Sequence, residues 1–176
     1  FRSINYNKKL IDCNIVINCA WTSNRDLQSF DHILCAKEMC LFMDDCKKIG
    51  IRVINLGSSS EYGVKYSPMR EDMICEPITT HGIGKLMTTL YAKNLGFNTL
   101  RLFSVTGGGR NFLDSYKNDN NCEYPTSNRD FVDIKLVCKA IERMLFAQHL
   151  YGEIINIGTG VNQNYGSIVG NKQINW

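Results

Sequence analysis

The chain has 176 residues, of which 20 are Lys or Arg, 17 are Asp or Glu, and 44% are hydrophobic. This length and hydrophobic content suit one folded domain with a proper core and exclude a disordered chain. The net charge of +3 comes from scattered basic residues, which excludes a nucleic-acid-binding stripe, and no apolar run reaches the roughly 18 residues of a membrane helix.

Strands and helices alternate along the first part of the chain. Strands are expected at residues 14–19, 51–56 and 98–105, and helices at residues 27–48 and 80–95. The strands are short apolar runs typical of burial on both faces of a sheet. Gly50 and Gly96 mark the ends of the two helices. This alternation requires crossover connections and therefore predicts an α/β fold with a doubly wound parallel sheet.

The pattern weakens in the second part of the chain. Residues 111–128 are rich in Asn, Asp, Ser and Lys, which predicts a loop. Apolar spacing then predicts a helix over 132–148 and a final strand over 153–157. Residues 161–176 have no clear periodicity.

The eight cysteines and three histidines lack the spacing of a zinc site, and no Cys-x-x-Cys pair is present. Several cysteines lie in apolar runs, where a free thiol behaves as a small hydrophobic group. No signal peptide is recognisable in the sequence. These features predict a protein of the reducing cytoplasm without a metal site and without a membrane partner.

Six segments follow one another in a recognisable order. They are residues 16–20 (Val-Ile-Asn-Cys-Ala), 57–63 (Gly-Ser-Ser-Ser-Glu-Tyr-Gly), 81–85 (His-Gly-Ile-Gly-Lys), 100–107 (Leu-Arg-Leu-Phe-Ser-Val-Thr-Gly), 129–132 (Arg-Asp-Phe-Val) and 156–160 (Asn-Ile-Gly-Thr-Gly). Together they resemble the motifs of the NAD-dependent epimerase/dehydratase family, the extended short-chain dehydrogenases/reductases. The resemblance covers nearly the whole chain.

The family layout implies an incomplete Rossmann-like dinucleotide-binding domain at residues 1–110. Residues 111–176 would form a shortened substrate-binding region that returns a helix and a strand to the sheet. Phe1 would fall near the end of the third strand. Roughly the first two βα units would then be absent, together with the glycine-rich turn that holds a dinucleotide pyrophosphate.

The resemblance implies that Ser58, His81 and Lys85 are catalytic. In the family, a Tyr-x-x-x-Lys pair and a serine act on a sugar hydroxyl while NAD accepts a hydride, and His81 stands at the tyrosine position. An imidazole has a suitable unperturbed pKa of about 6.5, but it reaches roughly 2 Å less far than a phenol. His81 could instead bind a substrate hydroxyl or only fill the place of the tyrosine, and Lys85 could be an exposed helix lysine.

Four further residues are expected at the substrate by resemblance: Ser59, Ser60, Arg110 and Arg129. Ser59 and Ser60 stand where dehydratases carry an acid pair, and elimination of water needs a general acid, so an epimerase or reductase is favoured. Both arginines are expected to bind the diphosphate of a nucleotide sugar. The alternatives are a polar turn for the serines and solvated loop positions for the arginines.

The cofactor residues implied by the resemblance are Ala20, Trp21, Lys85 and Ser104. NAD or NADP would bind only if the missing N-terminal half is supplied, and the residue that distinguishes the two lies in that half. Trp21 replaces a residue that is usually small, and its bulk could obstruct the cofactor.

The predicted function is hydride transfer at a hexose carbon of a nucleoside diphosphate sugar, by an epimerase, dehydratase or reductase. One alternative is an inactive homologue that binds a sugar nucleotide or partners an active copy. Another is the product of a decaying gene with an exposed sheet edge. Family members commonly dimerise through two long helices, which correspond to residues 27–48 and 80–95 here.

Overall fold

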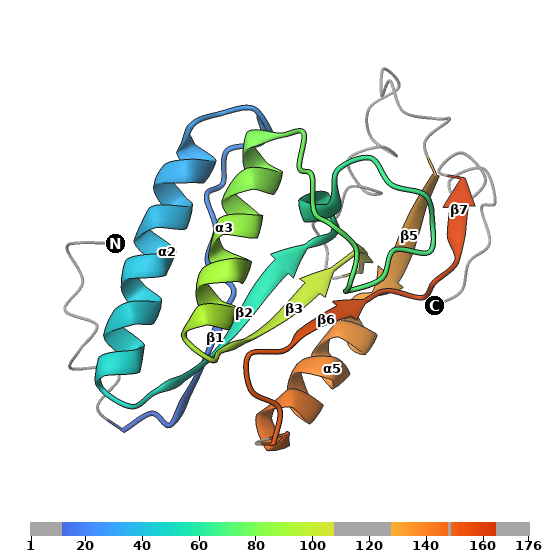
Figure 1. The fold of residues 1–176 in the computed structure, drawn as a ribbon. Helices are drawn as coiled ribbons and strands as arrows, with labels where there is room; N and C mark the ends of the chain where they lie inside the picture. The colour runs from blue at the N-terminus through green and yellow to red at the C-terminus, as the bar shows by residue number, and fades with distance from the viewer. Residues whose placement is uncertain (1–11, 108–127, 148, 165–176) are drawn as a thin grey trace.

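The computed structural model describes residues 12–107, 128–147 and 149–164, and its main feature is a parallel four-stranded sheet (Figure 1). The strands lie in the order β1-β2-β3-β6, and every neighbouring pair is parallel. Their bounds are β1 (Ile15–Asn18), β2 (Arg52–Ser58), β3 (Asn98–Leu102) and β6 (Ile154–Ile157).

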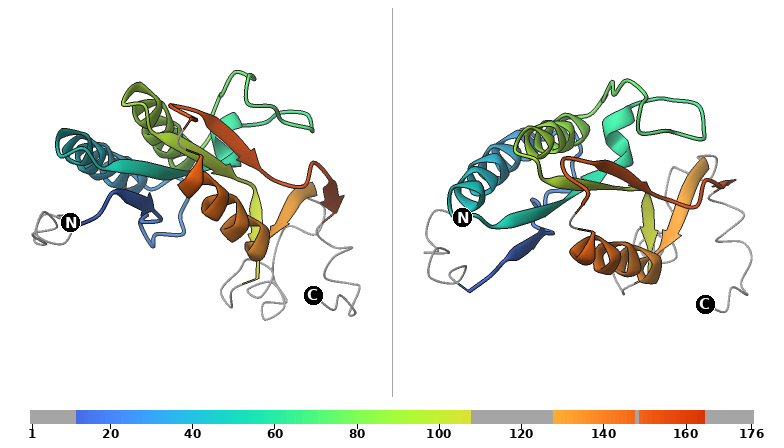
Figure 2. Two further views of the ribbon diagram at one scale, coloured as in Figure 1. Left: turned by 90° about the horizontal axis from the view of Figure 1, so that it is seen from below. Right: turned by 60° about the horizontal axis from the view of Figure 1, so that its bottom comes forward.

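Helices cover both faces of this sheet. The views in Figure 2 show α2 (Asp31–Lys48) and α3 (Thr80–Asn94) on one face and α5 (Ile134–Phe146) on the other. The predicted α/β fold with a doubly wound parallel sheet is therefore confirmed. None of the helices in the described part of the chain combines the length and apolar composition that a bilayer crossing requires.

The core has two parts, one on each side of the sheet. Successive strand residues point to opposite faces, so Val53 packs under α2 and α3 while its neighbour Ile54 packs under α5. On the first side Met43 and Phe97 join Val53, and on the second side Met144 joins Ile54. The near-continuous apolar character of β2 follows from burial on both faces.

The helix ends agree with the glycine signals in the sequence. α2 ends before Gly50 and α3 before Gly96, and these glycines have φ angles of 75° and 79°. Backbone in this region favours glycine because other residues clash there. Both turns lead directly into the next strand of the main sheet.

A second, smaller sheet differs from the sequence-based expectation. It contains β4 (Ser104–Thr106), β5 (Asn128–Asp133) and β7 (Asn162–Asn164), with β4 parallel and β7 antiparallel to β5. The single strand expected over 98–105 is thus divided at Phe103. Phe103 still donates its amide to the Ile157 carbonyl, but the residues after it pair with β5. β7 lies where no periodicity indicated a strand.

Candidate functional site

A cavity of about 580 Å³ lies where β2 ends and β4 follows β3. Six residues predicted from the sequence line it: Ser58, Ser59, Ser60, His81, Ser104 and Arg129. They come from the turn after β2, the first turn of α3 and the small sheet. The carboxyl edge of a parallel sheet is the usual place for a ligand site in such folds, because the connecting loops meet there.

The turn after β2 forms a chain of polar groups that ends at His81. Ser58 is the N-cap of the short 3₁₀ helix η1 (Ser59–Tyr62), and its Oγ accepts a hydrogen bond from the Ser60 amide. The Ser60 hydroxyl lies 2.8 Å from Ser58 Oγ and 3.1 Å from His81 Nδ1. Ser58, Ser60 and His81 therefore share one hydrogen-bonded chain along the wall of the cavity.

The capping pattern of α3 holds His81 in place. Thr79 caps the helix through its hydroxyl, which accepts from the Gly82 amide at 3.0 Å, and the His81 amide donates to the Leu27 carbonyl at 2.9 Å. The ring of His81 also meets the ring of His32 edge-on, with 5.0 Å between centroids. The Ser60 hydroxyl and the His32 ring thus contact the imidazole of His81 and fix its orientation.

Burial, followed by the nearby Lys85 and His32, lowers the pKa of His81 to about 4. The imidazole is therefore neutral at pH 7, which lets each ring nitrogen form a hydrogen bond but makes the group a weak base. A neutral imidazole beside a hydroxyl chain is well suited to binding sugar hydroxyls, which both donate and accept.

The lowered pKa of His81 predicts that the folded protein loses stability in acid. An unfolded chain binds a proton at His81 below about pH 6.5, whereas the folded protein does so only near pH 4. The free energy of unfolding should therefore fall as the pH drops from 6.5 to 4, by at most about 3 kcal/mol from this residue. Urea unfolding at pH 7 and pH 4.5 measures the loss. In His81→Asn the loss between these pH values should be smaller, and an equal loss in both proteins would contradict the assignment.

Lys85 lies on the same helix, but it does not line the cavity. Its ammonium donates to the Leu56 carbonyl at 3.0 Å and sits 3.9 Å from the centre of the Trp21 ring. Burial lowers the pKa of Lys85 to about 8, although Glu61 acts in the opposite direction. Trp21 and the carboxyl-terminal part of β2 therefore enclose this cation.

His32 fixes the position of Trp21. The indole Nε1 donates to His32 Nδ1 at 3.1 Å, so Nδ1 must be unprotonated, and His32 Nε2 faces the Asp26 carbonyl at 3.0 Å. With Nδ1 accepting, Nε2 carries the proton and donates to that carbonyl. Only 1% of His32 is exposed, so this arrangement is held inside the protein.

The comparisons with known proteins support one family. The model of the NAD-dependent epimerase/dehydratase family matches residues 5–158. The chain belongs to this family. No curated protein sequence matches this epimerase/dehydratase family member significantly.

Solved structures share the fold of this family member at low identity. MoeE5, solved with UDP-glucose and NAD, is 24% identical with a TM-score of 0.87, and the match covers 96% of this chain and 64% of MoeE5. UDP-glucuronic acid 4-epimerase from Bacillus cereus, solved with UDP-glucuronic acid and NAD, is 22% identical with a TM-score of 0.79, covering 96% of this chain and 61% of that one. DesIV, the dTDP-glucose 4,6-dehydratase of Streptomyces venezuelae, is 17% identical with a TM-score of 0.77, covering 93% and 57%. The chain thus spans about three fifths of the length of these proteins.

Of the remaining predicted residues, Trp21 lies next to the site, because its ring meets the His81 ring edge-on with 5.9 Å between centroids. Ala20 and Trp21 follow β1 and, like Lys85, do not line the 580 Å³ cavity. The Ala20 amide donates a hydrogen bond to Asn18 Oδ1 at 3.3 Å. Arg110 lies outside the described residues.

Glu61 was not predicted from the sequence, although this buried residue holds the turn after β2 through the Ser58 amide. The carboxylate accepts from the Ser58 amide at 2.7 Å and from the Thr89 hydroxyl at 3.0 Å, and it pairs with Arg101 at 2.9 Å. The spacing Ser58-x-x-Glu61 is that of a capping box, so the sequence did contain a signal for it. Its partner Arg101 comes from β3, and that long-range pairing has no local signature.

Lys65 and Phe103 also line the cavity without having been predicted. Lys65 pairs with the exposed carboxylate of Glu76. Among the described residues, no group of three or more His, Cys, Asp or Glu side chains is arranged to hold a metal ion. The cavity thus offers hydroxyls, an imidazole and the cations of Lys65 and Arg129 to a ligand, and it also contains the carboxylate of Asp130, which accepts hydrogen bonds from Thr159 and Gly160.

Proposed function

We propose that the cavity binds a nucleoside diphosphate sugar, and that the complete protein would transfer a hydride at a hexose carbon of this sugar. The observation that carries the proposal is the hydrogen-bonded series of side chains Ser58, Ser60 and His81. It lies on the wall of a cavity that Arg129 also lines. Membership of the NAD-dependent epimerase/dehydratase family supports it. So do the UDP-glucose in MoeE5 and the UDP-glucuronic acid in the Bacillus cereus epimerase.

Each polar group has a distinct place in this proposal. Ser58, Ser60 and neutral His81 would form hydrogen bonds to hexose hydroxyls. Ser59 and Ser104 line the same cavity and add hydroxyls to its wall. Arg129 would hold the diphosphate, because a guanidinium can bind two phosphate oxygens at once.

The residues of this chain do not fit a bound nicotinamide ribose in the arrangement described. Lys85, the expected ribose-binding lysine, donates to the Leu56 carbonyl, and the Trp21 ring covers its buried ammonium. We therefore assign no catalytic step to this chain alone. NAD or NADP would take part once a dinucleotide-binding half is present and Trp21 has moved from Lys85.

Two observations favour a second candidate, a module that binds the sugar nucleotide without turning it over. One is the low basicity of His81, and the other is the covered Lys85. Restoring tyrosine at position 81 separates the candidates. In a protein that contains the dinucleotide-binding half, His81→Tyr should raise turnover if the site is catalytic and leave turnover absent if it only binds.

Calorimetric titration with UDP-glucose, dTDP-glucose and GDP-mannose tests the binding function. At least one should bind, and Arg129→Met should weaken its binding about tenfold, because a charge-assisted contact to phosphate is lost. Lys135→Met, which changes an exposed lysine of α5 outside the cavity, is the matched control. No binding by any of the three, or equal loss in both variants, would contradict the proposal.

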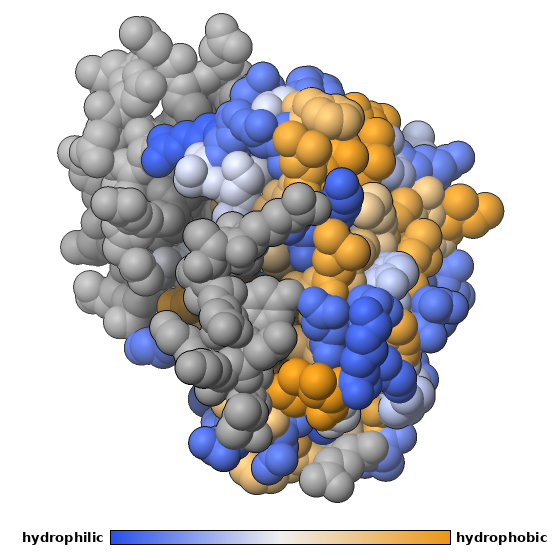
Figure 3. Space-filling model, turned by 90° about the vertical axis from the view of Figure 1, so that its left-hand side faces the viewer, coloured by the Kyte–Doolittle hydropathy of each residue, from blue (hydrophilic) through white to orange (hydrophobic). Residues whose placement is uncertain are grey.

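We also propose that α2 and α3 form a homodimer interface. Both helices carry exposed aliphatic residues: Leu34, Leu41, Ile83 and Leu90 are 46–54% exposed. Figure 3, seen from the α2 side of the molecule, shows hydrophobic surface among hydrophilic patches. Exposed apolar surface of this kind is commonly covered by a partner.

Light scattering after gel filtration measures this association. The protein should have the mass of a dimer, and Leu41→Lys with Leu90→Lys should convert it to a monomer, since burying two ammonium groups at the interface is unfavourable. Leu136→Lys, at an equally exposed position on α5, should remain dimeric. A monomeric unmodified protein would rule the interface out.

A further inference from the structure

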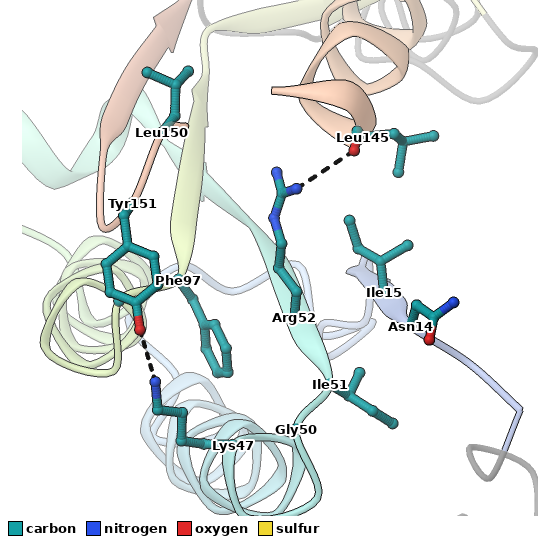
Figure 4. A pocket seen from close by; sticks show the side chains of 11 residues that line it. Asn14, Ile15, Lys47, Gly50, Ile51, Arg52, Phe97, Leu145, Leu150 and Tyr151 are labelled. Carbon is teal, nitrogen blue, oxygen red and sulfur yellow. Dashed lines mark hydrogen bonds between the residues drawn. The ribbon is translucent and has the colours of Figure 1, made fainter. Parts of the chain in front are cut away.

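A second cavity, of about 470 Å³, is shown in Figure 4. Its lining residues place it at the opposite end of the main sheet from the candidate sugar site. It is formed where β1, β2 and β3 begin, beside the last turns of α2 and α5. Ile15, Arg52 and Phe97 come from the starts of these strands or the residues just before them. A ligand here would therefore not compete with one bound beside Ser58.

Two cationic side chains reach this cavity from different elements. Lys47 comes from the last turn of α2 and donates to the Tyr151 hydroxyl at 2.8 Å, while Arg52 points toward the carbonyl of Leu145 on α5, as Figure 4 shows. No Asp or Glu is among the described residues that line the cavity. The local charge is therefore positive.

Neither cation is neutralised by an ion pair within the described part of the chain. The acidic residues near the end of α2, Asp44 and Asp45, pair with Lys48 instead. Both cations do lie at helix carboxyl ends, where they stabilise the helix dipole and, for Arg52, the carbonyls of Met144 and Leu145. This structural role uses one of the three donors of Lys47 and two of the five of Arg52, so donors remain for a ligand.

The rest of the cavity wall is apolar. It consists mainly of the aliphatic side chains Ile15, Ile51, Leu145 and Leu150 and the aromatic rings of Phe97 and Tyr151. The Lys47 ammonium lies 5.8 Å from the Phe97 ring centre and 5.5 Å from that of Tyr151, so the cation and the rings form one surface. Concave sites with an apolar lining and a few polar groups are typical of small-molecule binding.

We propose that this cavity binds a small amphipathic carboxylate. Its carboxylate would lie against the free donors of Lys47 and Arg52, and its apolar body would pack on Phe97 and the aliphatic side chains. A fully polar anion would leave the apolar wall unused, and a neutral hydrocarbon would leave the two cations unused. The ligand class follows from both features together.

Titration with 2-naphthoate and with 2-naphthamide tests the proposal, because the two probes share their shape and differ in charge. The naphthoate should bind at least about tenfold more tightly than the amide, since the amide cannot form charge-assisted hydrogen bonds. Chemical shifts of amides around residues 50–52 and 96–97 should move on binding. Equal binding of both probes, or no binding of the naphthoate, would overturn the inference.

Variants of two adjacent lysines locate the anion. Lys47→Met should weaken naphthoate binding about tenfold, and Lys48→Met, which removes the same charge one residue away and outside the cavity, should change it less than about twofold. Both positions are exposed, so neither change threatens the fold. Equal effects would show that only the net charge of the protein matters and would overturn the site. Arg129→Met should leave naphthoate binding unchanged, which separates this site from the sugar site.

Discussion

Replacing Arg101 with methionine is expected to lower the free energy of unfolding by about 3–5 kcal/mol. Arg101 and Glu61 are 2% and 0% exposed, and their side chains form an ion pair of 2.9 Å. Removing the guanidinium leaves a carboxylate in a site where water cannot compensate it. Burial already raises the pKa of Glu61, while Arg101 acts to lower it. Urea unfolding at pH 7, followed by circular dichroism, measures the change.

A double variant distinguishes a broken pair from lost packing. In Glu61→Gln with Arg101→Met, the charge disappears, yet the amide oxygen can still accept from the Ser58 amide and the Thr89 hydroxyl. The double variant should therefore be more stable than Arg101→Met alone, because replacing a whole buried pair costs far less than removing one partner. If the stability losses of the single variants Glu61→Gln and Arg101→Met add up to the loss in the double variant, the ion pair is not the source of the effect.

Removing the indole ring in Trp21→Ala should raise the pKa of Lys85 from about 8 toward its ordinary value of about 10.4. Two effects of the ring oppose each other. Its attraction for the ammonium contributes about 2 kcal/mol at most, whereas a shift of more than two pKa units corresponds to about 3 kcal/mol. Because Trp21 covers the ammonium, we expect the loss of burial to outweigh the loss of the cation–π contact.

Carbon-13 NMR of the lysine side chains over pH 6–11 measures this value. Trp21→Phe keeps an aromatic cover but cannot donate to His32, so its Lys85 should titrate close to pH 8. If the pKa of Lys85 stays low in Trp21→Ala, β2 and its surroundings alone are sufficient to bury the ammonium. Movement of Trp21 would then not expose Lys85 to a cofactor.

The fold was largely predictable because its signals are local. Apolar runs and glycine stops placed β2, α2 and α3 within a few residues of their observed bounds, and the order of elements implied the parallel sheet. The division of the strand at Phe103 was not predictable in the same way. It depends on pairing with β5, more than 20 residues later in the chain, and a strand that continues through a change of sheet reads as one apolar run.

The candidate site shows the same division between local and distant information. Ser58, Ser60 and His81 were predicted by resemblance, and the structure brings them into one hydrogen-bonded chain. The enclosure of Lys85 by Trp21 was not predicted, although the sequence indicated that the bulk of Trp21 could obstruct a cofactor. It depends on His32, a buried residue 11 positions away whose role as an acceptor has no sequence motif.

The bond from the Ser58 amide to Glu61 has a consequence for the dynamics of the site. Its acceptor is the fully buried carboxylate that also holds Arg101 and Thr89, which belong to different elements. The amide cannot open without disturbing β3 and α3 together. In deuterated solvent, we therefore expect Ser58 to exchange its proton only through global unfolding, as slowly as the central strands. The rim of the 580 Å³ cavity would then be as rigid as the core, and ligand binding there would involve little ordering of the turn after β2.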